Sequence, residues 1–223
     1  MSLSLSRAAV ARTVPYAAYV ALTALRSWGA DPRWFDVVTL AVVGALLAWN
    51  WRGYGELVRQ TWPTAGEVAL AVGVGVGLLA LSTQLDGFRI GAPREGFVPL
   101  DSDGAVSWPS VAIHALAVSL LVPLMDELFW RSFLLRWLQQ PQFEAVVPLR
   151  VGPKAIVLAT FVYTLAHPYW LTAALAGLTY ALLYVRTGKL WTPVIAHVVA
   201  NRAGSAIEGL ARYLLASSKS PAG

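Results

Sequence analysis

The stretch AIVLATFVYTLAHPYWLTAALAGLTYALLYV, residues 155–185, contains 31 residues and no charged side chain. A helix needs about 20 apolar residues to cross the hydrocarbon core of a bilayer. The stretch is too long for one ordinary span, and it is interrupted by His167-Pro168, where proline disfavours continuation of a helix. We therefore predict two membrane helices joined by a tight turn near His167–Trp170.

The same pattern extends along the rest of the chain. Further uncharged stretches are Thr13–Leu25, Val37–Trp51, Val68–Leu85, Gly104–Met125 and Leu190–Asn201. Only 13% of the residues are charged and 57% are hydrophobic, whereas soluble domains carry about 25% charged residues. The predicted fold class is all-α: one integral membrane domain over residues 1–223, a polytopic bundle of about seven to eight transmembrane helices. Gly204–Ser217 would supply the eighth helix.

Charge distribution predicts an orientation and argues against nucleic acid as a partner. The formal net charge is +5, but Lys and Arg are scattered singly or in pairs and form no basic stripe, which is typical of membrane-flanking charge. With seven spans, nine cations fall on one side and six on the other. The side with nine is the better cytoplasmic candidate, which places the N-terminus inside. We expect the first span to be retained rather than cleaved as a signal peptide.

The uncharged stretch Val68–Leu85 contains several glycines. Gly73 and Gly77 have the GxxxG spacing that, in a membrane helix, is typical of close packing against a neighbouring helix. The run is no dinucleotide-binding fingerprint, because it lies inside an apolar helix and lacks the required spacing. We predict that this helix packs closely through these glycines.

Two adjacent acids interrupt the apolar fourth span, which reads LVPLMDELFWR over residues 121–131. Charged side chains are costly inside a membrane and tend to be functional. Glu127 and Arg131 are i,i+4 neighbours on one helix face and should form an ion pair. Asp126 then points about 100° away. A packing role explains Glu127 and Arg131, but it does not explain the extra acid.

Two histidines and an amide lie at a similar depth. The chain has three histidines and no cysteine, so thiol nucleophiles, disulfides and iron–sulfur sites are excluded. Measured from the expected helix ends at Gln139, Lys154 and Lys189 on one membrane face, Asp126 and His167 lie roughly 20 Å deep and His197 roughly 12 Å deep. His197 and Asn201 share a face at i,i+4. His114 lies roughly 18 Å from Asp126, and we interpret it as a helix-start or interfacial residue.

Three motifs in order resemble the CPBP family of intramembrane proteases, which includes the CAAX prenyl endopeptidases. They are Asp126-Glu127-x-x-x-Arg131, Tyr163-x-x-x-His167 and His197-x-x-x-Asn201. The sequence that flanks these motifs is most similar to a bacterial branch related to CAAX proteases, which is associated with C-terminal protein sorting of the exosortase or myxosortase kind. The resemblance covers roughly Val118 to Asn201 and implies a catalytic core at approximately residues 110–203.

The resemblance implies a glutamic-type, metal-free intramembrane endopeptidase of the bacterial inner membrane, formerly grouped with metalloproteases. Its substrate would be a membrane protein or a lipidated C-terminal peptide, and its catalytic residues would be Asp126, Glu127, His167, His197 and Asn201. An acid and His167 would activate a water, while His197 and Asn201 would stabilise the oxyanion. Arg131 would support the acids, and Trp130 and Tyr163 would contact substrate. Zinc bound by a carboxylate and two histidines is the alternative cofactor.

Two departures from the family pattern keep other functions open. Aspartate replaces the first glutamate at position 126, and tyrosine replaces phenylalanine at position 163. Because aspartate is one methylene shorter, a catalytically inactive membrane partner or immunity-type relative is one alternative. A proton-coupled transporter is another, since buried acids and histidines also form proton relays, although the chain shows no internal repeat.

Overall fold

The computed structural model describes residues 6–27, 32–58, 62–85, 87, 88, 90, 103 and 106–201. The longer helices are α1 (Arg7–Ser27), α2 (Pro32–Asn50), α4 (Ala65–Leu85), α5 (Trp108–Leu116), α8 (Pro153–Leu165), α9 (Trp170–Thr187) and a last helix over residues 191–201. Within these described ranges, four helical segments are long and apolar enough to cross a membrane: Arg7–Arg26, Trp34–Gly53, Ala65–Leu85 and Trp108–Gln139. The prediction of an all-α membrane bundle is confirmed. The expected eighth helix at Gly204–Ser217 lies outside the described residues.

One long helix occupies the middle of the bundle. It runs from Trp108 to Gln139 through α5, η2 (Ala117–Leu121), α6 (Val122–Glu127), η3 (Leu128–Leu135) and α7 (Arg136–Gln139). The segments η2 and η3 are π-helical, a geometry often found at functional sites. The sequence places Asp126, Glu127 and Arg131 on this span, and the helix does continue through all three residues. These charges are accommodated by the pairing described below.

The break at His167-Pro168 occurs where the sequence predicts it. Helix α8 ends at Leu165 and α9 begins at Trp170. The backbone N–H of His167 donates to the carbonyl of Thr164 at 3.2 Å, which closes the last turn before the proline. The two helices then pack against each other along their length. His167 is thus held, half-buried, in the short turn between α8 and α9.

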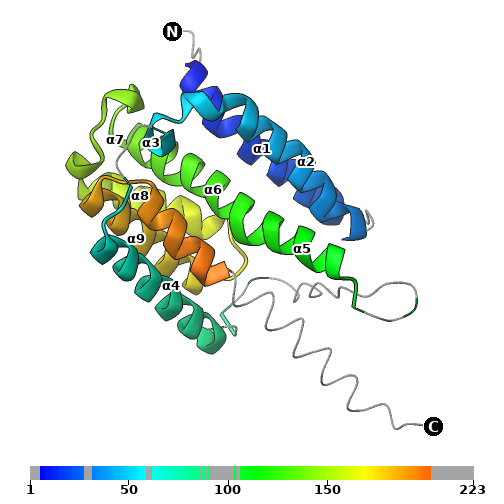
Figure 1. The fold of residues 1–223 in the computed structure, drawn as a ribbon. Helices are drawn as coiled ribbons and strands as arrows, with labels where there is room; N and C mark the ends of the chain where they lie inside the picture. The colour runs from blue at the N-terminus through cyan, green and yellow to red at the C-terminus, as the bar shows by residue number, and fades with distance from the viewer. Residues whose placement is uncertain are drawn as a thin grey trace.

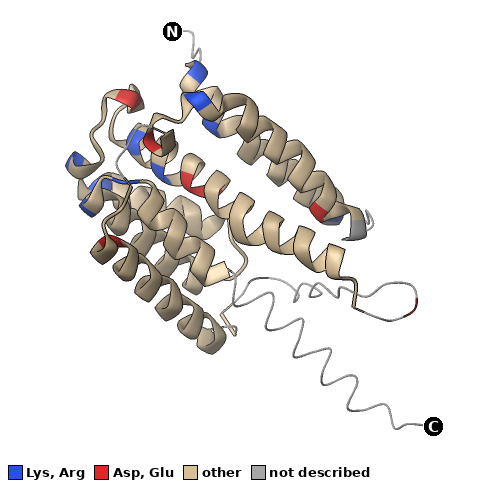
Figure 2. Ribbon diagram, in the orientation of Figure 1, with Lys and Arg blue, Asp and Glu red and all other residues tan. Residues whose placement is uncertain are grey.

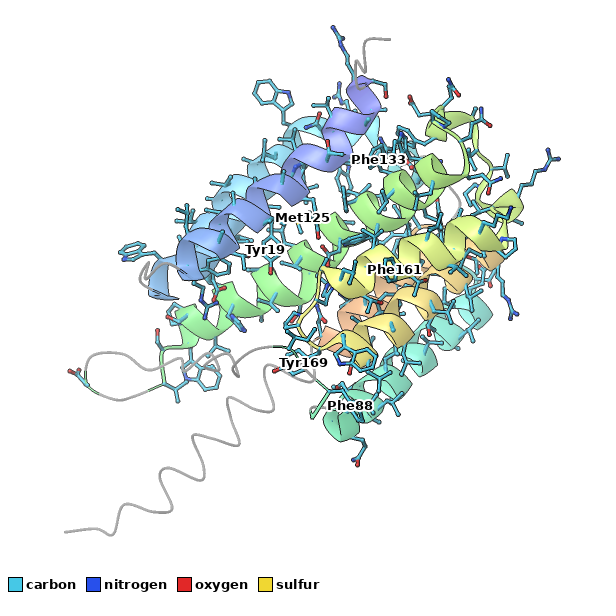
Figure 3. The ribbon with its side chains drawn as sticks, turned by 180° about the vertical axis from the view of Figure 1, so that it is seen from behind. Tyr19, Phe88, Met125, Phe133, Phe161 and Tyr169 are labelled. Carbon is cyan, nitrogen blue, oxygen red and sulfur yellow. The ribbon has the colours of Figure 1, made fainter. Side chains whose placement is uncertain are left out.

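Two groups of helices flank the central helix (Figure 1). The hairpin of α1 and α2 covers one side, while α4, α8, α9 and the last helix cover the other. Met125 is fully buried where α1 approaches the central helix, and Phe161 of α8 is exposed on the outside of the bundle (Figure 3). Residues of the central helix can therefore meet residues from both flanking groups.

Helix α4 packs closely through a glycine other than the two predicted. A Cβ atom built on Gly75 would lie 2.6 Å from the carbonyl oxygen of Ala196 in the last helix. Among the described residues, nothing lies within 4 Å of a Cβ built on Gly73 or Gly77. The prediction of close packing holds for the helix but is wrong about the residues, because Gly73 and Gly77 both face away from the contact.

A buried charge network ties α1 to the central helix. Glu56, in the short helix α3 (Gly55–Val58), accepts from Arg12 Nη2 at 2.6 Å and from Arg136 Nη2 at 2.5 Å. Ser132 donates to the same carboxylate and accepts from Arg12 Nε at 2.7 Å. Most of the Lys and Arg residues coloured blue in Figure 2 lie at the end of the bundle where α1 begins.

Replacing Glu56 with glutamine should destabilise the protein by about 3–5 kcal/mol, because two buried guanidinium groups lose their counter-ion. Burial alone raises the pKa of Glu56, but Arg12 and Arg136 outweigh it and lower the pKa below its ordinary value of 4.5. The stabilisation is therefore present above pH 4.5 and lost as the pH falls through the lowered pKa. Thermal unfolding in detergent at several pH values measures both effects. An equal acid dependence in the Glu56→Gln variant would contradict this account.

Candidate active site

A cavity of about 600 Å³ opens inside the bundle, and four of the five residues predicted to be catalytic line it. These are Asp126 of the central helix, His167 of the α8–α9 turn, and His197 and Asn201 of the last helix. Tyr19 of α1 and Tyr169, just before α9, line the same cavity, and Figure 3 labels both. Three segments that are distant in sequence thus bring two histidines, a carboxylate and an amide to one space.

Asp126 and Glu127 have different surroundings. Asp126 lines the cavity and is 5% exposed. Its side chain makes no recorded hydrogen bond or ion pair with any described residue. Glu127 is fully buried, and it is not one of the residues that line the cavity. Its Oε1 atom accepts from Arg131 Nη1 at 3.2 Å and from His197 Nδ1 at 2.8 Å. The expected i,i+4 pair is present, but Arg131 bonds only one of the two acids.

Arg131 is fixed from several sides. Its Nη2 atom donates to the carbonyl of Gly177 in α9 at 3.2 Å. Its guanidinium lies over the rings of Tyr163 and Tyr180, at 4.6 and 5.2 Å from their centroids, where cation–π attraction adds to the ion pair. A Cβ at position 177 would lie 2.9 Å from Tyr163 Cδ1, so this glycine makes room for the tyrosine ring. The Glu127 carboxylate is therefore held in a rigid setting.

His167 has one tautomer set by its surroundings. Its Nδ1 atom lies 2.7 Å from the carbonyl oxygen of Tyr163. A carbonyl only accepts, so Nδ1 carries the proton and the lone pair of a neutral ring is on Nε2. The ring also stacks on Tyr163, with centroids 4.1 Å apart. Tyr163, one of the two positions at which the sequence departs from the family pattern, thus orients the histidine through both its backbone and its side chain.

His197 is oriented by comparable contacts. Its ring stacks on Tyr180 of α9 at 4.9 Å. Because Arg131 already donates to Oε1 of Glu127, that oxygen acts as an acceptor and Nδ1 of His197 is the donor. Four residues further along, Asn201 Nδ2 donates to the carbonyl of Val118 in the central helix at 3.4 Å. Both side chains of this motif are therefore tied to the central helix.

Trp130 and His114 occupy positions outside the cavity lining. Trp130 is 3% exposed and packs edge-on against Tyr16 and Tyr163, so it supports the wall from behind instead of forming the surface expected for substrate contact. His114 Nδ1 lies 2.8 Å from Asp36 in α2, which agrees with its exclusion from the site. Tyr163 does line the cavity.

Sequence reasoning missed the other tyrosines of the cavity. Tyr16, Tyr19, Tyr169 and Tyr180 line it together with Tyr163. Tyr16 and Tyr19 come from α1, which carries none of the recognised motifs. An aromatic residue on an apolar helix gives no sign of which neighbour it faces, so only the assembled bundle identifies these residues.

No group of three or more His, Asp or Glu side chains that could hold a metal ion occurs within the described ranges. Of the two neighbouring carboxylates, Glu127 already accepts hydrogen bonds from Arg131 and His197, which leaves Asp126 as the carboxylate that faces the cavity. We therefore derive no catalytic step through a metal ion.

The comparisons with known proteins agree with the motif region. Residues 108–203 match the family model described as "Type II CAAX prenyl endopeptidase Rce1-like". The match covers less than half of the chain, and it includes the central helix, α8, α9 and the described part of the last helix. No curated protein and no solved structure matches the chain.

Proposed function

We propose that this protein is a CPBP-type intramembrane endopeptidase that hydrolyses a peptide bond near the C-terminus of a membrane-anchored or lipidated protein, using an activated water. The observation that carries the proposal is the single cavity lined by Asp126, His167 and His197 within an apolar helical bundle. The match of residues 108–203 to a family of endopeptidases supports the same reaction class.

Water activation falls to the groups that face the cavity. Asp126 lines the cavity and is not engaged by Arg131, so its carboxylate is suited to accept a proton from water. His167, with its proton on Nδ1, presents Nε2 as a second acceptor. A carboxylate and an imidazole acting on one water give general-base catalysis, with the proton passing later to the leaving amine. Glu127 takes no direct part in this step.

Oxyanion stabilisation falls to the last helix. Glu127 accepts from His197 Nδ1 and serves as the counter-ion of an imidazolium, whose Nε2–H then donates to the oxyanion of the tetrahedral intermediate. Asn201 lies one turn further on, and its amide supplies a second donor. Two donors fixed before the reaction begins are the arrangement that stabilises developing negative charge most effectively.

Charge distribution and the family resemblance support a location and an orientation in the membrane. Described Lys and Arg residues gather at the end of the bundle where α1 begins (Figure 2), which supports a cytoplasmic N-terminus. The resemblance to a bacterial branch supports the inner membrane and a role in C-terminal protein sorting. The expected partners are the lipid bilayer and the protein substrate, without nucleic acid and without a metal cofactor.

The proposal predicts a change in the C-termini of membrane proteins. Mass spectrometry of cells with and without the gene should detect shortened C-termini that depend on the wild-type chain and disappear with an Asp126→Asn variant of equal abundance. If no C-terminus differs, the non-catalytic membrane partner becomes the better account, because the replacement of glutamate at position 126 already favours it.

A cleavage assay after chelation tests whether the reaction is independent of metal ions. The purified protein is incubated with the identified substrate after treatment with a strong chelator, and cleavage should continue at the untreated rate. Loss of cleavage that zinc alone restores would overturn the metal-free mechanism and favour zinc as the cofactor.

A further inference from the structure

We propose that Gly75 of α4 is a positioning residue that sets the distance between His197 and Glu127. This inference rests on the proposed function for its catalytic meaning, but the geometric claim is independent of that function. Helix α4 contains none of the three motifs that resemble the protease family, and it lies outside the segment that matches the family model. Its contact with the last helix nevertheless falls next to His197.

The contact is too close for any side chain larger than hydrogen. A Cβ at position 75 would lie 2.6 Å from the carbonyl oxygen of Ala196 and 2.7 Å from Val199 Cβ. Real Cβ atoms essentially never approach other atoms closer than 3.0 Å, so one of the two helices would have to move. Because the first of these atoms belongs to the backbone, no side-chain rotation can relieve the clash. Ala196 and Val199 flank His197 in sequence.

The last helix has little freedom to absorb such a movement. His197 donates to Glu127 at 2.8 Å, and its ring stacks on Tyr180. Asn201 is bonded to the central helix through Val118. Hydrogen bonds of this kind occupy a range of only about 2.7–3.2 Å. A displacement of a few tenths of an ångström by α4 therefore changes the His197–Glu127 hydrogen bond directly.

The same helix supplies matched controls. Gly73 and Gly77 lie two residues to either side of Gly75, yet a Cβ on either meets nothing within 4 Å among the described residues. Alanine at all three positions favours the helix in the same way, since glycine is a poor helix former. A difference between Gly75→Ala and the two controls thus reports the contact with the last helix and not a general effect on α4.

The experiment measures the histidine side chains directly. The chain has only three histidines, so nitrogen-15 histidine labelling in detergent gives three imidazole signals, which His114→Ala, His167→Ala and His197→Ala assign. In Gly75→Ala the His197 signal should shift or lose its bonded Nδ1 proton, while the His114 signal stays in place as a sign of an intact fold. Gly73→Ala and Gly77→Ala should leave all three signals unchanged.

Kinetics with an identified substrate provide a second measurement. Gly75→Ala should lower kcat by about 10-fold with KM changed little, because the displacement is a few tenths of an ångström and a misplacement of about 1 Å costs about 100-fold. If Gly75→Ala does not fold, Val199→Leu enlarges the same contact from the other helix and should shift the same His197 signal. An unchanged His197 signal in either folded variant overturns the proposal, as does an equal shift in Gly73→Ala. Should the wild-type chain cleave nothing, the proposed function fails while the imidazole signals still decide the role of Gly75.

Discussion

Replacing either His167 or His197 with alanine should lower kcat/KM for peptide cleavage by about 100-fold or more, while the protein remains folded in detergent. The loss of His167 removes a general base, which is worth about 10²–10⁴-fold. The loss of His197 removes an oxyanion donor, which is worth about 10²–10³-fold. Each variant is assayed with the substrate found by C-terminal mass spectrometry, and thermal unfolding establishes that it is folded.

His114→Ala is the matched control for these two variants. His114 is the one remaining histidine of the chain, and it bonds Asp36 in α2 instead of lining the cavity. Its replacement should leave kcat/KM unchanged even where it lowers the unfolding temperature. If both His167→Ala and His197→Ala cleaved the substrate at the wild-type rate, the protein would not be an endopeptidase of the proposed kind.

Asp126→Ala should lower kcat/KM for peptide cleavage by about as much as the two histidine replacements do. Asp126→Glu should retain or raise activity. Asp126 is the acid that lines the cavity, and glutamate at this position restores the longer side chain of the family pattern. The measurement is the rate of product formation at equal concentrations of folded protein.

The comparison with Glu127 makes this assignment testable. Glu127→Gln should also reduce cleavage, but through His197, whose Nδ1 then loses an ionic partner. It should also lower the unfolding temperature, since Arg131 is left buried without its counter-ion. Asp126→Ala should have a much smaller effect on unfolding. A fully active Asp126→Ala variant would show that the water-activating acid has been assigned wrongly.

The sequence was informative about position along each helix. The His167-Pro168 break divides the 31-residue stretch where proline requires it, and the central helix ends at Gln139 as expected. Depth follows from counting residues, because the helical rise is constant. The meeting of Asp126, His167 and His197 at one cavity agrees with these depths.

Rotation about the helix axis was much harder to predict. The GxxxG spacing pointed to Gly73 and Gly77, but the close contact belongs to Gly75. Trp130 was expected to face substrate and instead packs behind Tyr163. A membrane helix is apolar on most of its surface, so hydrophobicity does not distinguish the face that meets lipid from the face that meets another helix. Only for charged residues with an obvious partner, such as Glu127 and Arg131, does the sequence predict the direction in which the side chain points from the helix.

The division of labour between the two acids has a practical consequence. Glu127 joins the central helix, the last helix and, through Arg131, helix α9, so the bundle depends on it. Asp126 makes no recorded hydrogen bond to any described residue. An Asp126→Asn chain should therefore keep its shape, admit its substrate and release nothing. Such a substrate trap, expressed in the native cell and purified with whatever remains bound, offers a direct way to identify the substrate of the proposed cleavage.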